Sequence, residues 1–163
     1  INPDYNNLYE ITEDTIDSLR LSASLKKISI INKINRGLIF FGDKNMIKTI
    51  LRNLLYNAIK FNNPGGQVII GYNDYPDFLE IYVHDNGIGI SPENLEKLFK
   101  KDLGFSTYGT NNEKGIGLGL VLCQELITKN RGKIYVESKE GEGSTFYFTL
   151  HKKADTFYCS ANN

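Results

Sequence analysis

The segment over residues 44–61 constrains the fold more than any other part of the chain. Apolar residues recur there every three or four positions and form one continuous stripe, made of Ile47, Ile50, Leu51, Leu54, Leu55 and Ala58. This spacing is typical of an amphipathic helix that buries one face. The residues Asn62-Asn63-Pro64-Gly65-Gly66 then end it. A helix with so continuous a stripe needs a second layer to cover that face.

Short β-rich segments supply this second layer. Strands are expected over residues 27–32, 37–42, 67–72, 78–84, 133–138 and 144–150, and further helices over 12–24, 91–99 and 118–129. Thr12 is the expected N-cap of the first helix. About six strands, partly in adjacent pairs, and four helices predict an α/β two-layer sandwich. Its sheet is expected to be mixed and mostly antiparallel, with the helices on one face.

The length of 163 residues favours a single domain. We expect it to cover residues 8–150, after a flexible start over 1–7 and before a disordered tail over 151–163. Residues 100–114 show no periodicity, and a connection of this length indicates a functional lid or a disordered segment. Because the first residue is Ile1 rather than Met, we expect a piece of a longer chain.

Composition excludes several classes of partner. The 19 basic residues balance the 19 acidic ones, so no broad basic field exists to bind a nucleic acid or an anionic membrane. Cys123 and Cys159 form neither a disulfide framework nor a zinc-ligand spacing, which favours a reducing compartment. No apolar run reaches the roughly 18 residues that span a bilayer. A local anion-binding cleft remains compatible with zero net charge.

The polar side of the helix over 44–61 is the first of four patterns that carry chemistry. Asn53, Asn57 and Lys60 are spaced by four and three residues, so they share one stripe beside the apolar one. An amide oxygen can ligate Mg²⁺, and a lysine can contact a phosphate. The same three side chains also fit an ordinary solvated helix face.

The second pattern is the end of the expected strand over 78–84. Asp85 follows this strand directly, and Gly87 and Gly89 allow close backbone approaches that a Cβ would block. A carboxylate at this place can accept a hydrogen bond from an adenine amino group. A tight turn capped by an aspartate is the alternative interpretation.

The other two patterns are glycine-rich. Gly115, Gly117 and Gly119 precede an apolar helix, where unpaired N–H groups favour an anion such as a polyphosphate. This stretch matches neither the Rossmann fingerprint nor the phosphate-binding loop. The fourth pattern, Gly141-Glu142-Gly143-Ser144-Thr145, also fits a simple hairpin turn.

In this order, the four patterns closely resemble the ATP-binding catalytic domain of sensor histidine kinases. That domain belongs to a superfamily that includes gyrase, the heat-shock 90 chaperones and mismatch-repair ATPases. The segment Asn53-Leu-Leu-Tyr-Asn57-Ala-Ile-Lys60-Phe61 is similar to the kinase N box nearly letter for letter. The resemblance covers roughly residues 8–150.

The resemblance implies a role for each matching residue. Asn57 is expected to bind Mg²⁺, Asn53 to lie near the phosphates and Lys60 to contact a phosphate. Asp85 is expected to accept from the adenine amino group. The other expected ATP-binding residues are Phe61, Gly87, Gly89, Leu98, Phe99, Lys114, Gly115, Gly117, Leu118, Gly119, Leu120 and Thr145, and residues 100–114 are expected to form a mobile ATP lid.

The resemblance also implies an activity, the transfer of the γ-phosphoryl group of Mg-ATP to a protein histidine. Water-splitting members of the superfamily carry a general-base glutamate where this chain has Asn53, so hydrolysis is expected to be slow. Neither His84 nor His151 lies on an amphipathic helix beside an acid, so the acceptor is expected on a separate dimerisation domain before Ile1. The alternatives are a nucleotide-gated ATPase of the same superfamily and a non-catalytic nucleotide-binding domain.

The expected partners follow from the same resemblance. They are ATP, Mg²⁺, the histidine-bearing dimerisation domain of the parent chain and, indirectly, a response-regulator receiver domain. The piece itself is expected to be a monomer, and the parent a homodimer. The expected location is the cytoplasm. Many relatives cross a membrane, so the parent protein is compatible with an anchor in the inner membrane.

Overall fold

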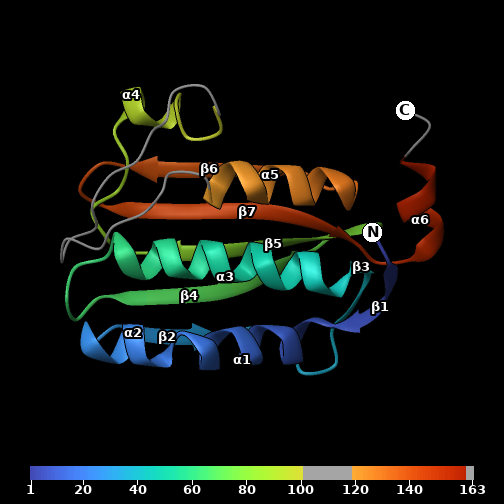
Figure 1. The fold of residues 1–163 in the computed structure, drawn as a ribbon, viewed down its shortest axis with the longest axis horizontal. Helices are drawn as coiled ribbons and strands as arrows, with labels where there is room; N and C mark the ends of the chain where they lie inside the picture. Colours follow the sequence, from blue (N-terminus) through green and yellow to red (C-terminus); the bar gives the residue numbers. More distant parts are fainter. Residues whose placement is uncertain (101–118, 161–163) are drawn as a thin grey trace.

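The computed structural model describes residues 1–100 and 119–160, which form seven strands and six helices (Figure 1). The strands are β1 (Pro3–Asn7), β2 (Ser29–Asn32), β3 (Ile39–Asp43), β4 (Gln67–Asp74), β5 (Phe78–Asp85), β6 (Ile134–Lys139) and β7 (Gly143–His151). The helices are α1 (Leu8–Ser18), α2 (Arg20–Leu25), α3 (Lys44–Lys60), α4 (Pro92–Leu95), α5 (Gly119–Lys129) and α6 (Ala154–Cys159).

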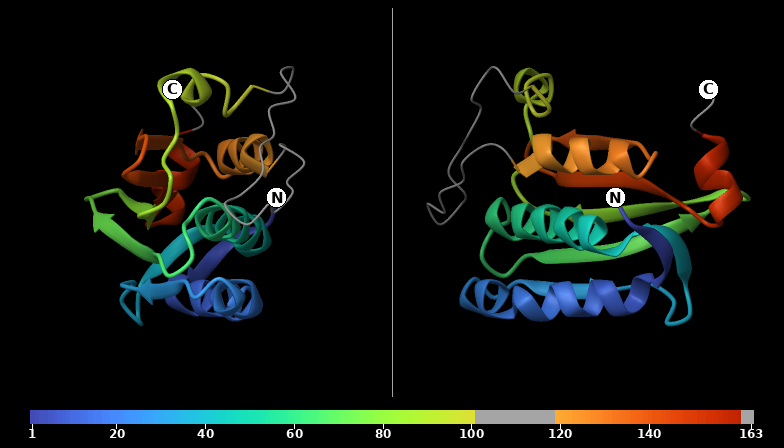
Figure 2. Two further views of the ribbon diagram at one scale, coloured as in Figure 1. Left: turned by 90° about the vertical axis from the view of Figure 1, so that its left-hand side faces the viewer. Right: turned by 45° about the vertical axis from the view of Figure 1, so that its right-hand side comes forward.

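All seven strands form one sheet. Its order is β1-β3-β7-β5-β4-β2, and β6 pairs with β7 beside this path. Only the β2–β4 pair is parallel, and the other pairs are antiparallel. Helices α1, α3 and α5 lie side by side on one face of the sheet (Figures 1 and 2). The expected α/β two-layer sandwich with a mixed, mostly antiparallel sheet is therefore confirmed.

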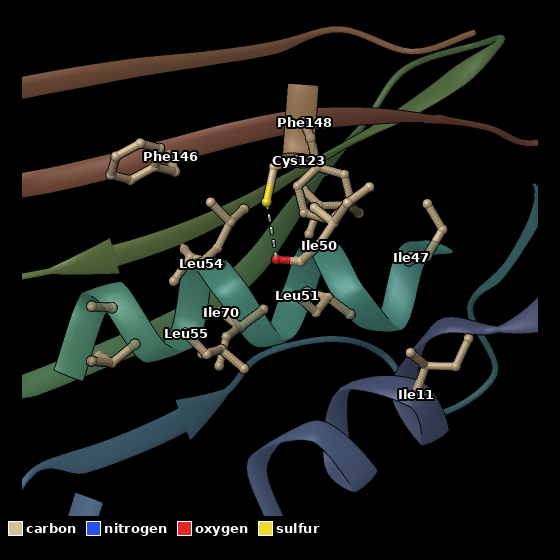
Figure 3. Packing of buried hydrophobic residues seen from close by; sticks show 14 of the residues in the cluster. Ile11, Ile47, Ile50, Leu51, Leu54, Leu55, Ile70, Cys123, Phe146 and Phe148 are labelled. Atoms are coloured by element: carbon tan, nitrogen blue, oxygen red, sulfur yellow. Dashed lines mark hydrogen bonds between the residues drawn. The ribbon is translucent and has the colours of Figure 1, made fainter. Parts of the chain in front are cut away.

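Helix α3 lies at the centre of the helical layer. Asp43 is its N-cap, because the carboxylate accepts from the backbone N–H of Met46 at 3.1 Å. The predicted apolar stripe of α3 is buried along its whole length and packs against Ile70 of β4 and Phe148 of β7 (Figure 3). On the other side, the Cys123 thiol of α5 donates to the Ile50 carbonyl at 3.9 Å. Burial raises the pKa of Cys123 to about 12, so this thiol is a small core residue.

The chain start differs from the expectation of a flexible segment over residues 1–7. Strand β1 pairs along its whole length with β3, with Tyr5 opposite Phe41. Asn7 is the N-cap of α1, since its side chain accepts from the backbone N–H of Glu10 at 3.0 Å. Thr12 is therefore not the cap. It is buried inside α1, where its hydroxyl donates to the Leu8 carbonyl at 2.8 Å.

The expected single helix over residues 12–24 is two helices, because the chain breaks between α1 and α2 at Leu19. The expected disordered tail over 151–163 also needs correction. Strand β7 extends to His151, and α6 follows it. Phe157 of α6 is buried and packs edge-on against Phe41 of β3, with ring centroids 5.3 Å apart. Residues 161–163 lie outside the described part of the chain.

The expected helix over residues 91–99 is shorter in the structure. Helix α4 begins after Ser91, whose hydroxyl accepts from the Asn94 backbone N–H at 3.3 Å, and ends at Leu95. Of the lid predicted over 100–114, all but Lys100 lies outside the described residues. None of the described helices is long and apolar enough to cross a membrane.

Candidate functional site

The polar stripe of α3 meets the first residue of α5. A Cβ placed on Gly119 would lie only 2.8 Å from Oδ1 of Asn53, so the two helices approach closely at this point. Asn53 is held by a hydrogen bond from its Nδ2 to the Thr49 carbonyl at 2.9 Å. One turn later, Asn57 is half-buried. The structure thus brings together two of the predicted phosphate-side positions, Asn53 and Gly119, and the half-buried Leu120 follows them.

The C-terminal end of α3 carries Lys60 and Phe61. Lys60 is buried, and its Nζ lies 4.8 Å from the centroid of the Phe61 ring. The Phe61 carbonyl accepts from the backbone N–H of Ile88 at 3.1 Å. This bond attaches the end of α3 to the loop that follows β5. The predicted contact of Lys60 with a phosphate stays a prediction.

Asp85 is the last residue of β5, one residue beyond the predicted end of this strand, and only 4% of its surface is exposed. Its Oδ1 accepts from the backbone N–H of Gly87 at 2.9 Å. Burial raises the pKa of this carboxyl to about 6, against the opposing effect of backbone hydrogen bonds from Gly87 and Ser144. A carboxylate held in this way is a strong acceptor for a ligand N–H group.

Gly87 and Gly89 let the loop after Asp85 pack tightly. A Cβ on Gly87 would lie 2.3 Å from the Phe61 carbonyl oxygen, which no side chain tolerates. Gly89 has a φ of +69° and lies against the Lys139 carbonyl. The loop is therefore fixed between the end of α3 and the β6–β7 turn, and the position of Asp85 is fixed with it.

The hairpin serine, rather than the threonine after it, accompanies Asp85. In the β5–β7 register, Asp85 lies opposite Ser144 and His84 lies opposite Thr145. Residues directly opposite share a face of the sheet, and successive residues alternate. Ser144 is buried with Asp85, at 6% exposure, whereas Oγ1 of Thr145 lies 2.8 Å from Nδ1 of His84 on the opposite face. Thr145, which was predicted near the base, therefore lies on the opposite face from Asp85, and Ser144 is the hairpin residue on the Asp85 side.

The alternation of β7 is the signal that identifies Ser144. Ser144, Phe146, Phe148 and Leu150 are buried, and the residues between them are half-exposed.

The remaining predicted site residues lie near the lid. Leu98 is buried and Phe99 is half-buried, and both pack against the core. Lys114, Gly115, Gly117 and Leu118 lie outside the described residues.

The described site residues thus form two groups along α3. Asn53, near the middle of this helix, meets Gly119. Asp85 and Ser144 lie beyond the C-terminal end of the helix. The rise along the helix from Asn53 to Phe61 is about 12 Å. This arrangement fits an elongated ligand that offers an N–H donor at one end and anionic groups at the other.

Known proteins resemble this chain over most of its length. The family model described as histidine kinase-, DNA gyrase B-, and HSP90-like ATPase matches residues 42–154. The adaptive-response sensory kinase SasA of Thermosynechococcus vestitus is 32% identical over 146 residues, which cover 88% of this chain and 38% of that kinase. The chain thus spans well under half the length of this relative.

Solved structures agree with the sequence comparison. The catalytic domain of histidine kinase ThkA is 28% identical and aligns with a TM-score of 0.82 over 96% of this chain and 99% of that one. A structure of ThkA in complex with the response regulator protein TrrA aligns with a TM-score of 0.76 at 25% identity, over 94% of this chain and 42% of that one. Because the family model covers well over half of the residues, this chain belongs to the family of histidine kinase-, DNA gyrase B- and HSP90-like ATPases, with the fold of a histidine kinase catalytic domain.

Proposed function

We propose that the chain binds Mg-ATP at the site along α3 and transfers the γ-phosphoryl group to a histidine on a separate dimerisation domain. The observation that carries this proposal is Asp85, a buried carboxylate at the end of a strand, which accepts backbone hydrogen bonds from Gly87 and Ser144. Its remaining acceptor capacity suits the adenine amino group. Phe61, Gly87 and Gly89 shape the adenine end, and Leu98 and Phe99 border the start of the lid.

Asn57 is the proposed protein ligand for Mg²⁺. Magnesium prefers oxygen donors and usually combines few protein ligands with substrate phosphates and water. Within the described residues no group of three or more His, Cys, Asp or Glu side chains could hold a metal ion, so an amide oxygen together with ATP phosphates is the donor set that fits. When bound, Mg²⁺ neutralises phosphate charge.

The phosphate end is proposed to lie at the start of α5. Asn53 and Gly119 meet there, and a helix N-terminus offers unpaired N–H groups to an anion. Leu120 continues this end, and Lys60 is proposed to reach a phosphate from α3. The preceding residues Lys114, Gly115, Gly117 and Leu118 are proposed to complete it. Since the Asn53 amide cannot take a proton from water, this site favours transfer over hydrolysis.

The proposed protein partners are a histidine-bearing dimerisation domain and, through it, a response-regulator receiver domain. The ThkA structure with response regulator TrrA supports the second of these. We propose that this chain alone is monomeric and that the longer protein to which it belongs is a homodimer. We also propose that the domain works in the cytoplasm. The balanced charge supports the absence of a nucleic-acid partner.

Transfer of labelled phosphate tests this function. With γ-labelled Mg-ATP and the parent's dimerisation domain supplied separately, Asn57→Ala is expected to lower the transfer rate about 100-fold, because the metal loses its protein ligand. Asn45→Ala, at the far exposed end of α3, is the matched control and is expected to retain the rate. Steady hydrolysis without transfer would favour a gated ATPase, and binding without either would favour a non-catalytic domain.

Calorimetric titration with Mg-ATP tests the choice between Ser144 and Thr145. Ser144→Ala is expected to weaken ATP binding about fivefold to tenfold, since one hydrogen-bonding group beside Asp85 is lost. Thr145→Val keeps the shape of the side chain on the opposite face and is expected to leave the affinity unchanged. The reverse order of effects would restore the original assignment of Thr145.

A further inference from the structure

The face of the sheet opposite α1, α3 and α5 carries a row of tyrosines. This face is turned away from these helices in the left view of Figure 2. Tyr82 of β5 lies opposite Tyr147 of β7, and Tyr147 lies opposite Tyr135 of β6. We call these three residues the tyrosine row. None of them is buried, so the row is accessible from solvent.

The rings of the tyrosine row contact one another. Tyr135 and Tyr147 are stacked, with centroids 5.1 Å apart and planes 16° apart, and Tyr82 is tilted toward Tyr147 at 6.4 Å. On β4 the position opposite Tyr82 is Gly71, and a Cβ there would lie 2.2 Å from the Tyr82 hydroxyl. Tyr82 thus extends over β4. The row gives a continuous aromatic surface across four strands.

Two carboxylates flank the tyrosine row on either side. Glu80 precedes Tyr82 by two residues on β5, and Glu137 follows Tyr135 by two residues on β6, so all four side chains share one face. The Tyr147 hydroxyl donates to Glu137 Oε2 at 3.3 Å. Burial, and then Glu137 and Glu80, raise the pKa of Tyr147, so both carboxylates act on this ring.

Neither carboxylate has a cationic partner within the described residues. The described ion pairs lie elsewhere, and that of Lys139 is with Glu142 in the β6–β7 turn, at 3.2 Å. Lys133, directly before β6, pairs with neither Glu80 nor Glu137. Lys133 and Lys139 lie on this face of β6 by the same alternation. The surface around the row is therefore aromatic and carries two carboxylates that no described cation pairs with.

We propose that the tyrosine row with Glu80 and Glu137 binds an arginine-bearing basic segment of a partner protein. A guanidinium group stacks on tyrosine rings and pairs with carboxylates in the same geometry. Both kinds of group are present here, and the cation that would satisfy them is supplied by the partner. A neutral segment would gain the aromatic contact alone, and an acidic one would be repelled. The surface lies on the opposite side of the sheet from the proposed ATP site and is independent of it.

NMR titration of the ¹⁵N-labelled chain, without nucleotide, tests this proposal. The probe is a glycine-spaced tetra-arginine peptide, and its control replaces each arginine with citrulline, the neutral isostere. The arginine peptide is expected to shift amide signals of Glu80, Tyr82, Tyr135, Glu137 and Tyr147 in a saturable way. The citrulline peptide is expected to bind at least about tenfold more weakly, or about 1.4 kcal/mol.

Two double variants locate the site. Glu80→Gln with Glu137→Gln is expected to weaken the arginine peptide about tenfold. Glu140→Gln with Glu142→Gln removes the same charge from the β6–β7 turn and is expected to leave the affinity within about twofold. Equal loss in both variants, equal binding of the citrulline peptide, or no saturable shift at millimolar peptide would each overturn the proposal. Unchanged amide spectra away from the substitutions show that each variant remains folded.

Discussion

Asp85→Asn is expected to weaken Mg-ATP binding about 100-fold and, at the same time, to make the free domain harder to unfold. The binding loss follows because the adenine amino group would face an amide in place of a charged acceptor, and hydrogen bonds to charged groups contribute most. Calorimetric titration measures the first effect, and urea unfolding at pH 7 measures the second.

The gain in stability follows from the pKa of Asp85. Burial raises this pKa to about 6 from the ordinary 3.8, so the folded state disfavours the charged carboxyl. Folding is favoured by the protonated group below pH 4, and this contribution is lost as the pH rises through 6. At pH 7 the difference between the folded-state pKa and the ordinary pKa of Asp85 lowers the unfolding free energy by at most about 3 kcal/mol. An asparagine avoids this cost and keeps an acceptor for the Gly87 N–H.

The same pKa predicts how ATP binding depends on pH. A protonated Asp85 carboxyl is a poor acceptor for the adenine amino group. The ATP affinity of the unsubstituted chain is therefore expected to fall as the pH drops from 7 to 5. The Asp85→Asn variant is expected to show no such fall in that window. If the Mg-ATP affinity of the unsubstituted chain stayed constant from pH 7 to 5, the proposed role of Asp85 as the adenine acceptor would be contradicted.

Asp43→Asn is the matched control for the effect on stability. Asp43 is also a buried carboxyl, and burial alone would raise its pKa. Backbone hydrogen bonds from Asn2, Met46 and Asn45 nevertheless hold the pKa below 3.8. The folded state thus favours its charged form, and Asp43→Asn is expected to lower the unfolding free energy at pH 7. If both variants moved stability in the same direction, the explanation by desolvation of Asp85 would fail.

The parts of the fold that local pattern encodes were predictable. The apolar stripe of α3, the strand that ends at Asp85 and the β6–β7 hairpin all follow from spacing within a single segment. Strand β1 and helix α6 do not, because their stability comes from distant partners. The polar sequence Pro3–Asn7 becomes a strand through pairing with β3, and α6 is held by Phe157 against Phe41.

The candidate site shows the same division. Asp85 and its glycines were identified from the residues that end a strand, and the structure joins them to Phe61 at the end of α3. The prediction of Thr145 followed a short motif, whereas the alternation of β7 places Ser144 on the side of Asp85. Which hairpin residue faces Asp85 depends on the register between β5 and β7. That register is fixed by tertiary packing of the buried faces.

Gly143→Ala is expected to lower the unfolding free energy by about 3 kcal/mol or more and to weaken ATP binding. Gly143 has a φ of +113°, and a Cβ on it would lie 2.1 Å from the Asp85 carbonyl oxygen. An alanine therefore adds backbone strain of about 1–2 kcal/mol and a clash that only a shift of β5 or β7 relieves. Such a shift separates Ser144 from Asp85, so the loss of binding and the loss of stability occur together.

Gly141→Ala separates the backbone strain from the clash. Gly141 lies in the same turn with a φ of +84°, but a Cβ on it would meet nothing within 4 Å. This variant is expected to lose only the strain, about 1 kcal/mol, and to bind Mg-ATP as the parent does. Urea unfolding measures the loss of stability in both variants, and calorimetric titration measures their affinity for Mg-ATP. Equal losses of stability would show that the approach of the hairpin to Asp85 does not hold the site together.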